Sequence, residues 1–131
     1  MSGTSLMTAV QPESMPRPAG HYSPGIVANG LVFVSGQLPI DPATRAVVPG
    51  GADEQTERAL RNVELILEAA GSGLDRVVQM TIYIPDGGLW GEVNQAYARV
   101  MGDHRPTRAI VPVLPLHYGA LIEIQAIALA P

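Results

Sequence analysis

The sequence contains no cysteine, which excludes disulfide bonds, thiolate nucleophiles and metal sites built on sulfur. Charged residues make up only 15% of the chain and the net charge is −4, so no basic surface exists to follow the phosphates of a nucleic acid. No apolar run approaches the roughly 20 residues of a membrane-spanning helix, and the start of the chain does not read as a secretion signal. These absences argue against nucleic acid and membrane partners and favour a cytoplasmic location.

What is present fits one domain. The 131 residues are 47% hydrophobic, which is enough for a buried core, and we expect residues 1–131 to form a single domain. Residues 1–20 carry three prolines among small polar residues. This composition predicts a loosely ordered N-terminal arm, with a possible edge strand at residues 6–11.

The first clear element is a β-hairpin. Two β-rich runs, residues 26–28 and 31–37, are separated by Asn29-Gly30. Both central residues of a type I′ turn need positive φ, and Asn-Gly satisfies this requirement. Residues 39–51 contain Asp-Pro and Gly-Gly pairs and are predicted to form a loop.

Two helices are predicted from apolar residues that recur at helical spacing. The first covers about residues 53–70 and ends at Gly71. The second carries Trp90 and Tyr97 on its apolar side and ends at Gly102. Further strands are predicted at residues 77–84, 107–114 and 121–129.

This order of elements predicts an α+β domain in which a sheet of five to six strands carries two helices on one face. Alternation along the last strand places Ile122 and Ile124 toward the helices and Glu123 and Gln125 on the opposite face. On the strand predicted at residues 77–84, the same alternation places Val78 in the core. The face without helices is too apolar to stay exposed, and it predicts a homo-oligomer that packs sheet faces together with closed symmetry.

Two charged residues, Arg108 and Glu123, stand inside the last two β-rich runs. A charge taken out of water is costly unless a partner or ligand compensates it. Two such charges on neighbouring strand patterns predict a small pocket that holds an anion beside a base. Two structural alternatives stay open: Arg108 could pair with a surface carboxylate, and Glu123 could form an ion pair with Arg108 or a neighbour.

Three motifs carry a resemblance to a known family. They are Arg105-Pro106-Thr107-Arg108-Ala109, then Ile122-Glu123-Ile124, and Ser35-Gly36-Gln37 after a Gly-His-Tyr-Ser segment that contains Tyr22. They resemble the reactive intermediate deaminase (Rid, RidA-like) family over about residues 8–130. The resemblance implies a chorismate-mutase-like mixed sheet and a homotrimer with three pockets at subunit interfaces. It also implies hydrolysis of enamines and imines, such as 2-aminoacrylate, to 2-keto acids and ammonia.

The resemblance also implies roles for single residues. Arg108 is expected to grip the substrate carboxylate through its planar fork, and Glu123 to position the attacking water as a base. Tyr22 resembles the aromatic wall of the pocket. Ser35 and the backbone of Gly36 are expected to flank the ligand, and Asn94 resembles a family asparagine near the pocket.

No metal or cofactor is implied. The histidines His21, His104 and His117 are widely separated and show no metal-ligand spacing, and His104 and His117 are interpreted as loop or cap residues. The expected partner is therefore a small metabolite that carries a carboxylate.

Departures from the family pattern lie around the pocket. They are the segment Gly20-His21-Tyr22, the stretch 114–119, and Gln125, where a second carboxylate is frequent. They make the rim bulkier and less charged, and they predict a substrate larger than aminoacrylate. The alternatives to a deaminase are a non-hydrolytic cyclase or tautomerase, a metabolite-binding protein on the same trimeric scaffold, and an RNA-cleaving or translation-inhibiting role.

Overall fold

The computed structural model describes residues 6–131, so the first five residues of the expected N-terminal arm lie outside the described part. The strands of the main sheet are β1 (Met7–Val10), β2 (Gly25–Ala28), β3 (Leu31–Gln37), β6 (Val77–Ile84), β7 (Thr107–Pro112) and β8 (Glu123–Leu129). The helices are α1 (Ala52–Ala69) and α2 (Trp90–Met101), with short 3-10 turns η1 (Leu74–Arg76), η2 (Gly87–Leu89) and η3 (His117–Gly119). Both helices end beside the glycines that the sequence indicated.

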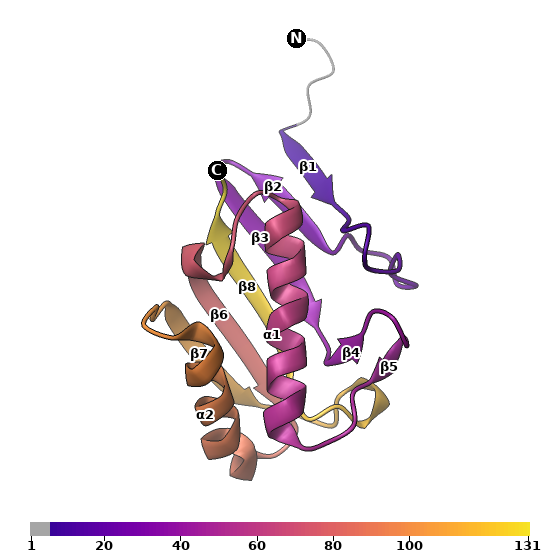
Figure 1. Cartoon of the computed structure of the whole chain (residues 1–131), viewed down its shortest axis with the longest axis vertical. Coiled ribbons are helices and arrows are strands. Elements are labelled where there is room, and N and C mark those ends of the chain that lie inside the picture. The colour runs from indigo at the N-terminus through magenta and orange to yellow at the C-terminus, as the bar shows by residue number, and fades with distance from the viewer. Residues whose placement is uncertain (1–5) are drawn as a thin grey trace.

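The sheet has the strand order β1-β2-β3-β8-β6-β7, and both helices lie on one of its faces (Figure 1). The predicted α+β architecture is therefore confirmed. Strands β6 and β7 are parallel and are joined by α2, whereas every other pair in this sheet is antiparallel. Because β6 lies between them, β7 and β8 are not neighbours, although they follow each other in the chain.

The turn between β2 and β3 has the predicted geometry. Asn29 and Gly30 have φ values of 51° and 78°, and Ala28 pairs with Leu31 across the turn. The predicted loop at residues 39–51 contains a small two-stranded sheet, β4 (Ile40–Asp41) and β5 (Ala46–Val47). Its strands have two residues each, which is too short to give an alternating pattern in the sequence.

The core lies between α1 and the sheet. From α1 it contains Ala59, Leu60, Val63, Ile66 and Leu67, and each of these side chains is fully buried. Two buried polar residues of α1 hold neighbouring segments. The Asn62 amide donates to the carbonyls of Leu38 (3.1 Å) and Ile40 (2.8 Å), and the Gln55 Oε1 accepts from the Leu121 N–H (2.8 Å). These bonds fix the chain just after β3 and just before β8.

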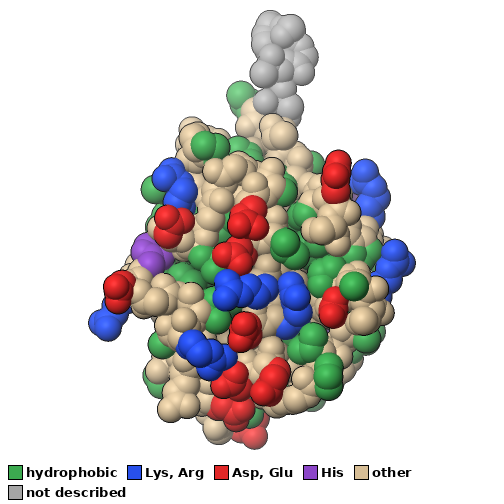
Figure 2. All heavy atoms as spheres, viewed as in Figure 1, with side chains coloured by type: hydrophobic (Ala, Val, Ile, Leu, Met, Phe, Trp, Pro, Cys, Tyr) green, Lys and Arg blue, Asp and Glu red, His purple; other side chains and the backbone are tan. Residues whose placement is uncertain are grey.

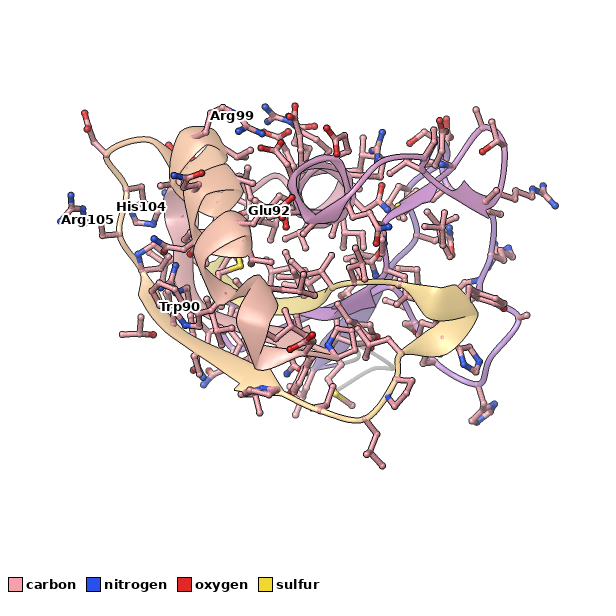
Figure 3. The ribbon with its side chains drawn as sticks, turned by 90° about the horizontal axis from the view of Figure 1, so that it is seen from below. Trp90, Glu92, Arg99, His104 and Arg105 are labelled. Carbon is pink, nitrogen blue, oxygen red and sulfur yellow. The ribbon has the colours of Figure 1, made fainter. Side chains whose placement is uncertain are left out.

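Charged side chains gather over the helices on the outer surface (Figure 2). Arg99 on α2 donates to carboxylates of Asp53 (2.7 Å) and Glu57 (3.3 Å) on α1, and the hydrogen bond from Arg99 lowers the pKa of Asp53. Glu92 accepts from the Asp53 N–H at 3.1 Å, and both Glu92 and Arg99 lie on the side of α2 toward α1 (Figure 3). In the described part of the chain, no helix is long and apolar enough to cross a membrane.

One strand departs from the predicted alternation. The register of β6 against β8 shifts between Val77 and Gln79, so an extra residue is accommodated there. As a result Val77 is buried and Val78 is 43% exposed, and the prediction that Val78 faces the core was wrong. After the shift, Met80, Ile82 and Ile84 are fully buried under the helices, as predicted.

The face without helices carries an apolar row. Phe33 on β3 stands between Ile26 on β2 and Ile127 on β8, and it is 40% exposed. Leu129, which pairs with Leu31, is 45% exposed. A row of this kind on a sheet face is a common feature of surfaces that pack against another chain.

Candidate functional site

The six residues expected at a site lie in two separate places. Tyr22, Ser35, Gly36 and Glu123 line one pocket, which is completed by Leu38, Pro115, Leu116 and His117. The other two residues, Asn94 and Arg108, contact each other on the helix side of β7.

A β-bulge shapes the first place. Between Val34 and Gln37 the register of β3 shifts, so Ser35 and Gly36 together oppose the single residue Gln125 on β8. The Ser35 hydroxyl donates to the Ser23 carbonyl at 2.7 Å, which ties the bulge to the segment that carries Tyr22. The bulge thus opens the ladder beside Glu123.

Gly36 and Glu123 are in close contact. A Cβ atom at position 36 would meet the Glu123 Oε2 at 2.5 Å, so glycine leaves room for the carboxylate in this position and a larger residue would make it shift. Within residues 6–131, the Glu123 carboxylate makes no hydrogen bond or ion pair. A partly buried carboxylate that opens into a pocket without a partner is available to a water, a ligand or another chain.

Tyr22 forms an outer wall of the same pocket and is 56% exposed. His117 also lines the pocket, from the η3 turn, and its ring lies 4.9 Å from the ring of Tyr118. The sequence interpretation of His117 as a loop residue is correct, but it did not include this histidine in the pocket. His104 is elsewhere, with its Nε2 at 2.8 Å from the Val77 carbonyl.

In the second place, α2 holds Arg108. The Arg108 Nη1 donates to the Asn94 Oδ1 at 2.8 Å, and the guanidinium carbon lies 4.9 Å from the Tyr97 ring centre and 5.6 Å from that of Trp90. Trp90, Asn94 and Tyr97 follow one another at spacings of four and three, so they share one side of α2. Trp90 lies on the side of α2 away from α1 (Figure 3).

Sequence reasoning missed this aromatic cradle, which consists of Trp90 and Tyr97 around Arg108. Both aromatics were assigned to the apolar side of the helix only. A signal was present, because the asparagine that was singled out stands between two aromatics at helical spacing. The two planar rings beside the guanidinium restrict it and add cation–π attraction.

The Tyr97 hydroxyl is buried and has no hydrogen-bond partner among residues 6–131. Burial raises the pKa of Tyr97, and the positive charge of Arg108 opposes this shift. The cradle therefore contains a neutral phenol beside a permanent cation.

Arg108 and Glu123 lie on opposite faces of the sheet. Arg108 pairs with Met80, which is fully buried under the helices. Glu123 pairs with Tyr83 on the face without helices, called the bare face below. They are also two strands and three residues apart, or roughly 14 Å. One protomer therefore does not form the predicted pocket that contains both charges. The pocket with both charges stays a prediction, and it needs a second copy of the chain because β6 separates the two strands.

The family model described as Endoribonuclease L-PSP matches residues 12–130. The chain belongs to this family. A RutC family protein of Pyrococcus horikoshii is 42% identical over 116 residues, which cover 88% of this chain and 92% of that protein.

Solved structures of the family agree with the fold. The Rid family protein YyfA from Yersinia pestis has a TM-score of 0.90 and 34% identity, covering 95% of this chain and 99% of that one. E. coli TdcF with bound serine has a TM-score of 0.88 and 31% identity, with coverage of 95% and 99%. The resemblance to Rid proteins drawn from the sequence is confirmed.

The structural alternatives for Arg108 and Glu123 were ion pairs with other residues of the chain or with each other. The three ion pairs between described residues involve neither Arg108 nor Glu123. No group of three or more His, Asp or Glu side chains in residues 6–131 is placed to hold a metal ion. Within the protomer, Arg108 is held by an amide and two rings, and Glu123 by packing against Gly36.

Proposed function

We propose that this protein is a homotrimeric enamine and imine deaminase that releases 2-keto acids and ammonia. The observation that carries the proposal is the Glu123 carboxylate, which has no partner among residues 6–131 and opens into a pocket beside Tyr22 and Ser35. A base of this kind, within reach of a bound water, is what addition of water to an imine needs. Membership of the Rid-containing family supports the same reaction.

Arg108 is the proposed anion site. Its Nη1 donates to the Asn94 Oδ1, and its other N–H groups form no ion pair with a carboxylate of residues 6–131. A planar guanidinium held by two rings can bind a carboxylate with two parallel hydrogen bonds. The serine bound to the related E. coli TdcF supports a ligand with a carboxylate next to a carbon that bears nitrogen.

The complete site is proposed to need two protomers, because one protomer keeps Arg108 and Glu123 on opposite faces. The edge strand β7 of one protomer would lie against the bare face of the next and bring Arg108 to Glu123. The apolar row around Phe33 supports a face that is covered in this way. Three copies close a ring with three equivalent sites.

The proposed reaction is simple. An enamine first takes a proton at carbon and loses one from nitrogen, which gives the imine. Glu123 then accepts a proton from water as the water oxygen bonds to the imine carbon, and the nitrogen takes up a proton. The resulting carbinolamine loses ammonia as its C–N bond breaks and its hydroxyl proton is transferred to the leaving nitrogen, which gives the 2-keto acid. Tyr22, Ser35 and the Gly36 backbone would orient the water and the nitrogen.

The family name includes ribonuclease activity, but the charge of this chain does not favour an RNA substrate. The net charge is −4, and the pocket contains a carboxylate that would repel phosphates. A small carboxylate-bearing metabolite needs only one cation, and Arg108 supplies it.

Ammonia release is the experiment that tests the proposed activity. Imines made freshly from a series of amino acids, by an amino acid oxidase, should lose ammonia faster with the protein than without it. The same rate in its presence and absence, for every imine tested and with an intact trimer, would sink the proposal in favour of a binding protein.

The oligomeric state is a separate prediction. Light scattering on a size-exclusion peak should give about three times 13.8 kDa, since the composite site needs closed symmetry. A stable monomer at working concentration would remove the interface site altogether.

Replacing Gly36 by alanine should lower turnover while the protein stays folded. The new methyl group would push the Glu123 carboxylate from its place, and misplacement by about 1 Å can cost about 100-fold. Kinetics and a melting curve measure the two effects. Gly91→Ala is the matched control, because a Cβ there meets nothing and lies on helix α2. Equal activity of the two variants would show that the contact with Gly36 does not matter.

A further inference from the structure

We propose that the substrate side chain binds in an apolar groove beside Glu123, so that this protein favours 2-imino acids with long aliphatic side chains. This inference rests on the proposed function for the identity of the reacting group. The groove itself is a separate observation, and it can be tested by binding alone.

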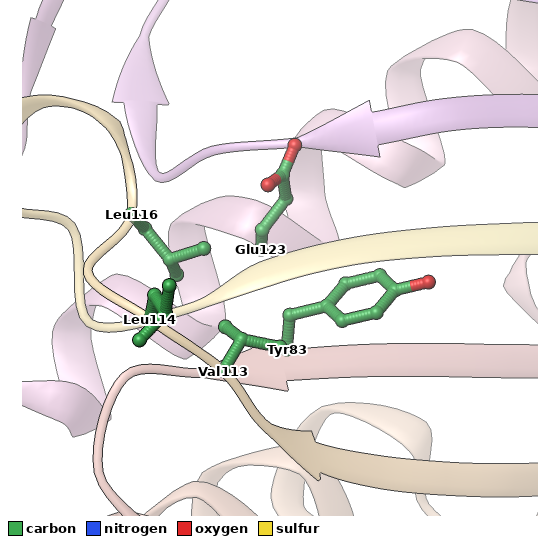
Figure 4. A pocket seen from close by; sticks show the side chains of 5 residues that line it. All are labelled: Tyr83, Val113, Leu114, Leu116 and Glu123. Carbon is green, nitrogen blue, oxygen red and sulfur yellow. The ribbon is translucent and has the colours of Figure 1, made fainter.

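Tyr83, Val113, Leu114 and Leu116 line the groove together with Glu123 (Figure 4). Two of these residues, Leu116 and Glu123, also line the pocket that contains Tyr22 and Ser35. Glu123 therefore stands where a polar pocket and an apolar groove meet. A molecule whose imine carbon lies at this carboxylate would have its polar groups in the pocket and room for its side chain in the groove.

The groove offers little to a polar side chain. Apart from Glu123, the only polar atom among its lining side chains is the Tyr83 hydroxyl, and this donates to the Gln125 Oε1 at 3.0 Å. In Figure 4 the Tyr83 hydroxyl points away from Leu114 and Leu116. The wall that remains is hydrocarbon, and it would gain by covering alkyl groups rather than hydroxyl or charged groups.

The segment that carries the two leucines is anchored by hydrogen bonds from backbone N–H groups on both sides. The Val113 N–H donates to the Ile84 carbonyl at 2.8 Å, and the Leu121 N–H donates to the Gln55 side chain at 2.8 Å. Pro115 restricts the chain between the two leucines. A preformed wall of this kind binds an alkyl chain without a large ordering cost.

Leu114 is the best residue for a test, because it is 84% exposed in the protomer and its removal leaves no cavity in the core. An exposed leucine could instead be covered by the next protomer. Continuity of the groove with Glu123 favours the substrate, since the base has to lie at the reacting carbon. A substrate side chain and a neighbouring protomer at Leu114 lead to different expected results for Leu114→Ala.

The test uses the intact trimer and unreactive 2-keto acids of increasing length, from pyruvate to 2-oxohexanoate. Each methylene group that enters the groove should tighten binding by about fourfold. Calorimetry, or the fluorescence of the single tryptophan Trp90 next to Arg108, gives the affinity. Leu114→Ala should weaken the binding of 2-oxohexanoate by about fourfold or more and leave the affinity for pyruvate unchanged. Leu6→Ala, at an exposed leucine outside the groove, is the control.

Equal affinity for all chain lengths would overturn the inference. The inference would also be overturned if the affinity of Leu114→Ala depended on chain length as it does in the wild type. If that variant also lost the trimer, Leu114 would be assigned to the subunit contact. Length-dependent binding without ammonia release from any imine would support the groove and contradict the deaminase. Turnover of imines with no dependence on side-chain length would support the deaminase and contradict the groove.

Discussion

Glu123→Gln should lower ammonia release by about 10²- to 10⁴-fold, which is the usual contribution of a positioned general base. The amide keeps the size and reach of the carboxylate, but it cannot take a proton from water. Glu123 has no partner among residues 6–131 of its own protomer, so the substitution should leave the melting temperature almost unchanged. A 2-keto acid should still bind through Arg108.

Melting temperature, affinity for 2-oxobutanoate and ammonia release on one preparation separate the roles of Glu123. If turnover and binding fall together and the trimer loosens, Glu123 is a structural partner across the interface. If turnover is unchanged in an intact trimer, the water is held by other groups, such as Tyr22, Ser35 or the backbone.

Arg108→Lys should weaken binding of a 2-keto acid by about 10- to 100-fold although the charge is kept. Lysine can replace one charged hydrogen bond to a carboxylate but not two in one plane, and each such bond contributes about 1.5 to 3 kcal/mol. Lysine would also lack the planar group that lies beside the rings of Trp90 and Tyr97. Turnover should fall at least as far.

Arg105→Lys is the matched control, because Arg105 is an exposed arginine three positions earlier and makes no ion pair with any residue from 6 to 131. It should keep wild-type affinity. Wild-type affinity in Arg108→Lys itself would show that Arg108 only fastens β7 to α2.

Much of the fold could be predicted because local signals and the global fold agree. Asn29-Gly30 specifies its turn, and the apolar spacing in α1 specifies which side is buried. The β-bulges could not be predicted in this way. An extra residue at Val78 or at Ser35-Gly36 changes the face of the sheet on which the next side chains lie. Nothing in an alternating sequence pattern marks such a residue.

The candidate site was predicted as a set of residues but not as an arrangement. Strand order decides whether Arg108 and Glu123 can meet, and β6 separates their strands. The α2 connection makes β6 and β7 a parallel pair, and β8 pairs with the other side of β6, so the consecutive strands β7 and β8 do not pair. The aromatic cradle was missed because Trp90 and Tyr97 were read only as core residues.

Mixed trimers test the composite site most directly. Arg108→Lys and Glu123→Gln proteins, each nearly inactive alone, are unfolded together in equal amounts and refolded. If each site takes Arg108 from one protomer and Glu123 from the next, about one quarter of the sites in random cyclic trimers contain both residues, and about that share of wild-type ammonia release should return. Mixtures no more active than the separate variants, in trimers shown to be mixed, would contradict a site shared between protomers.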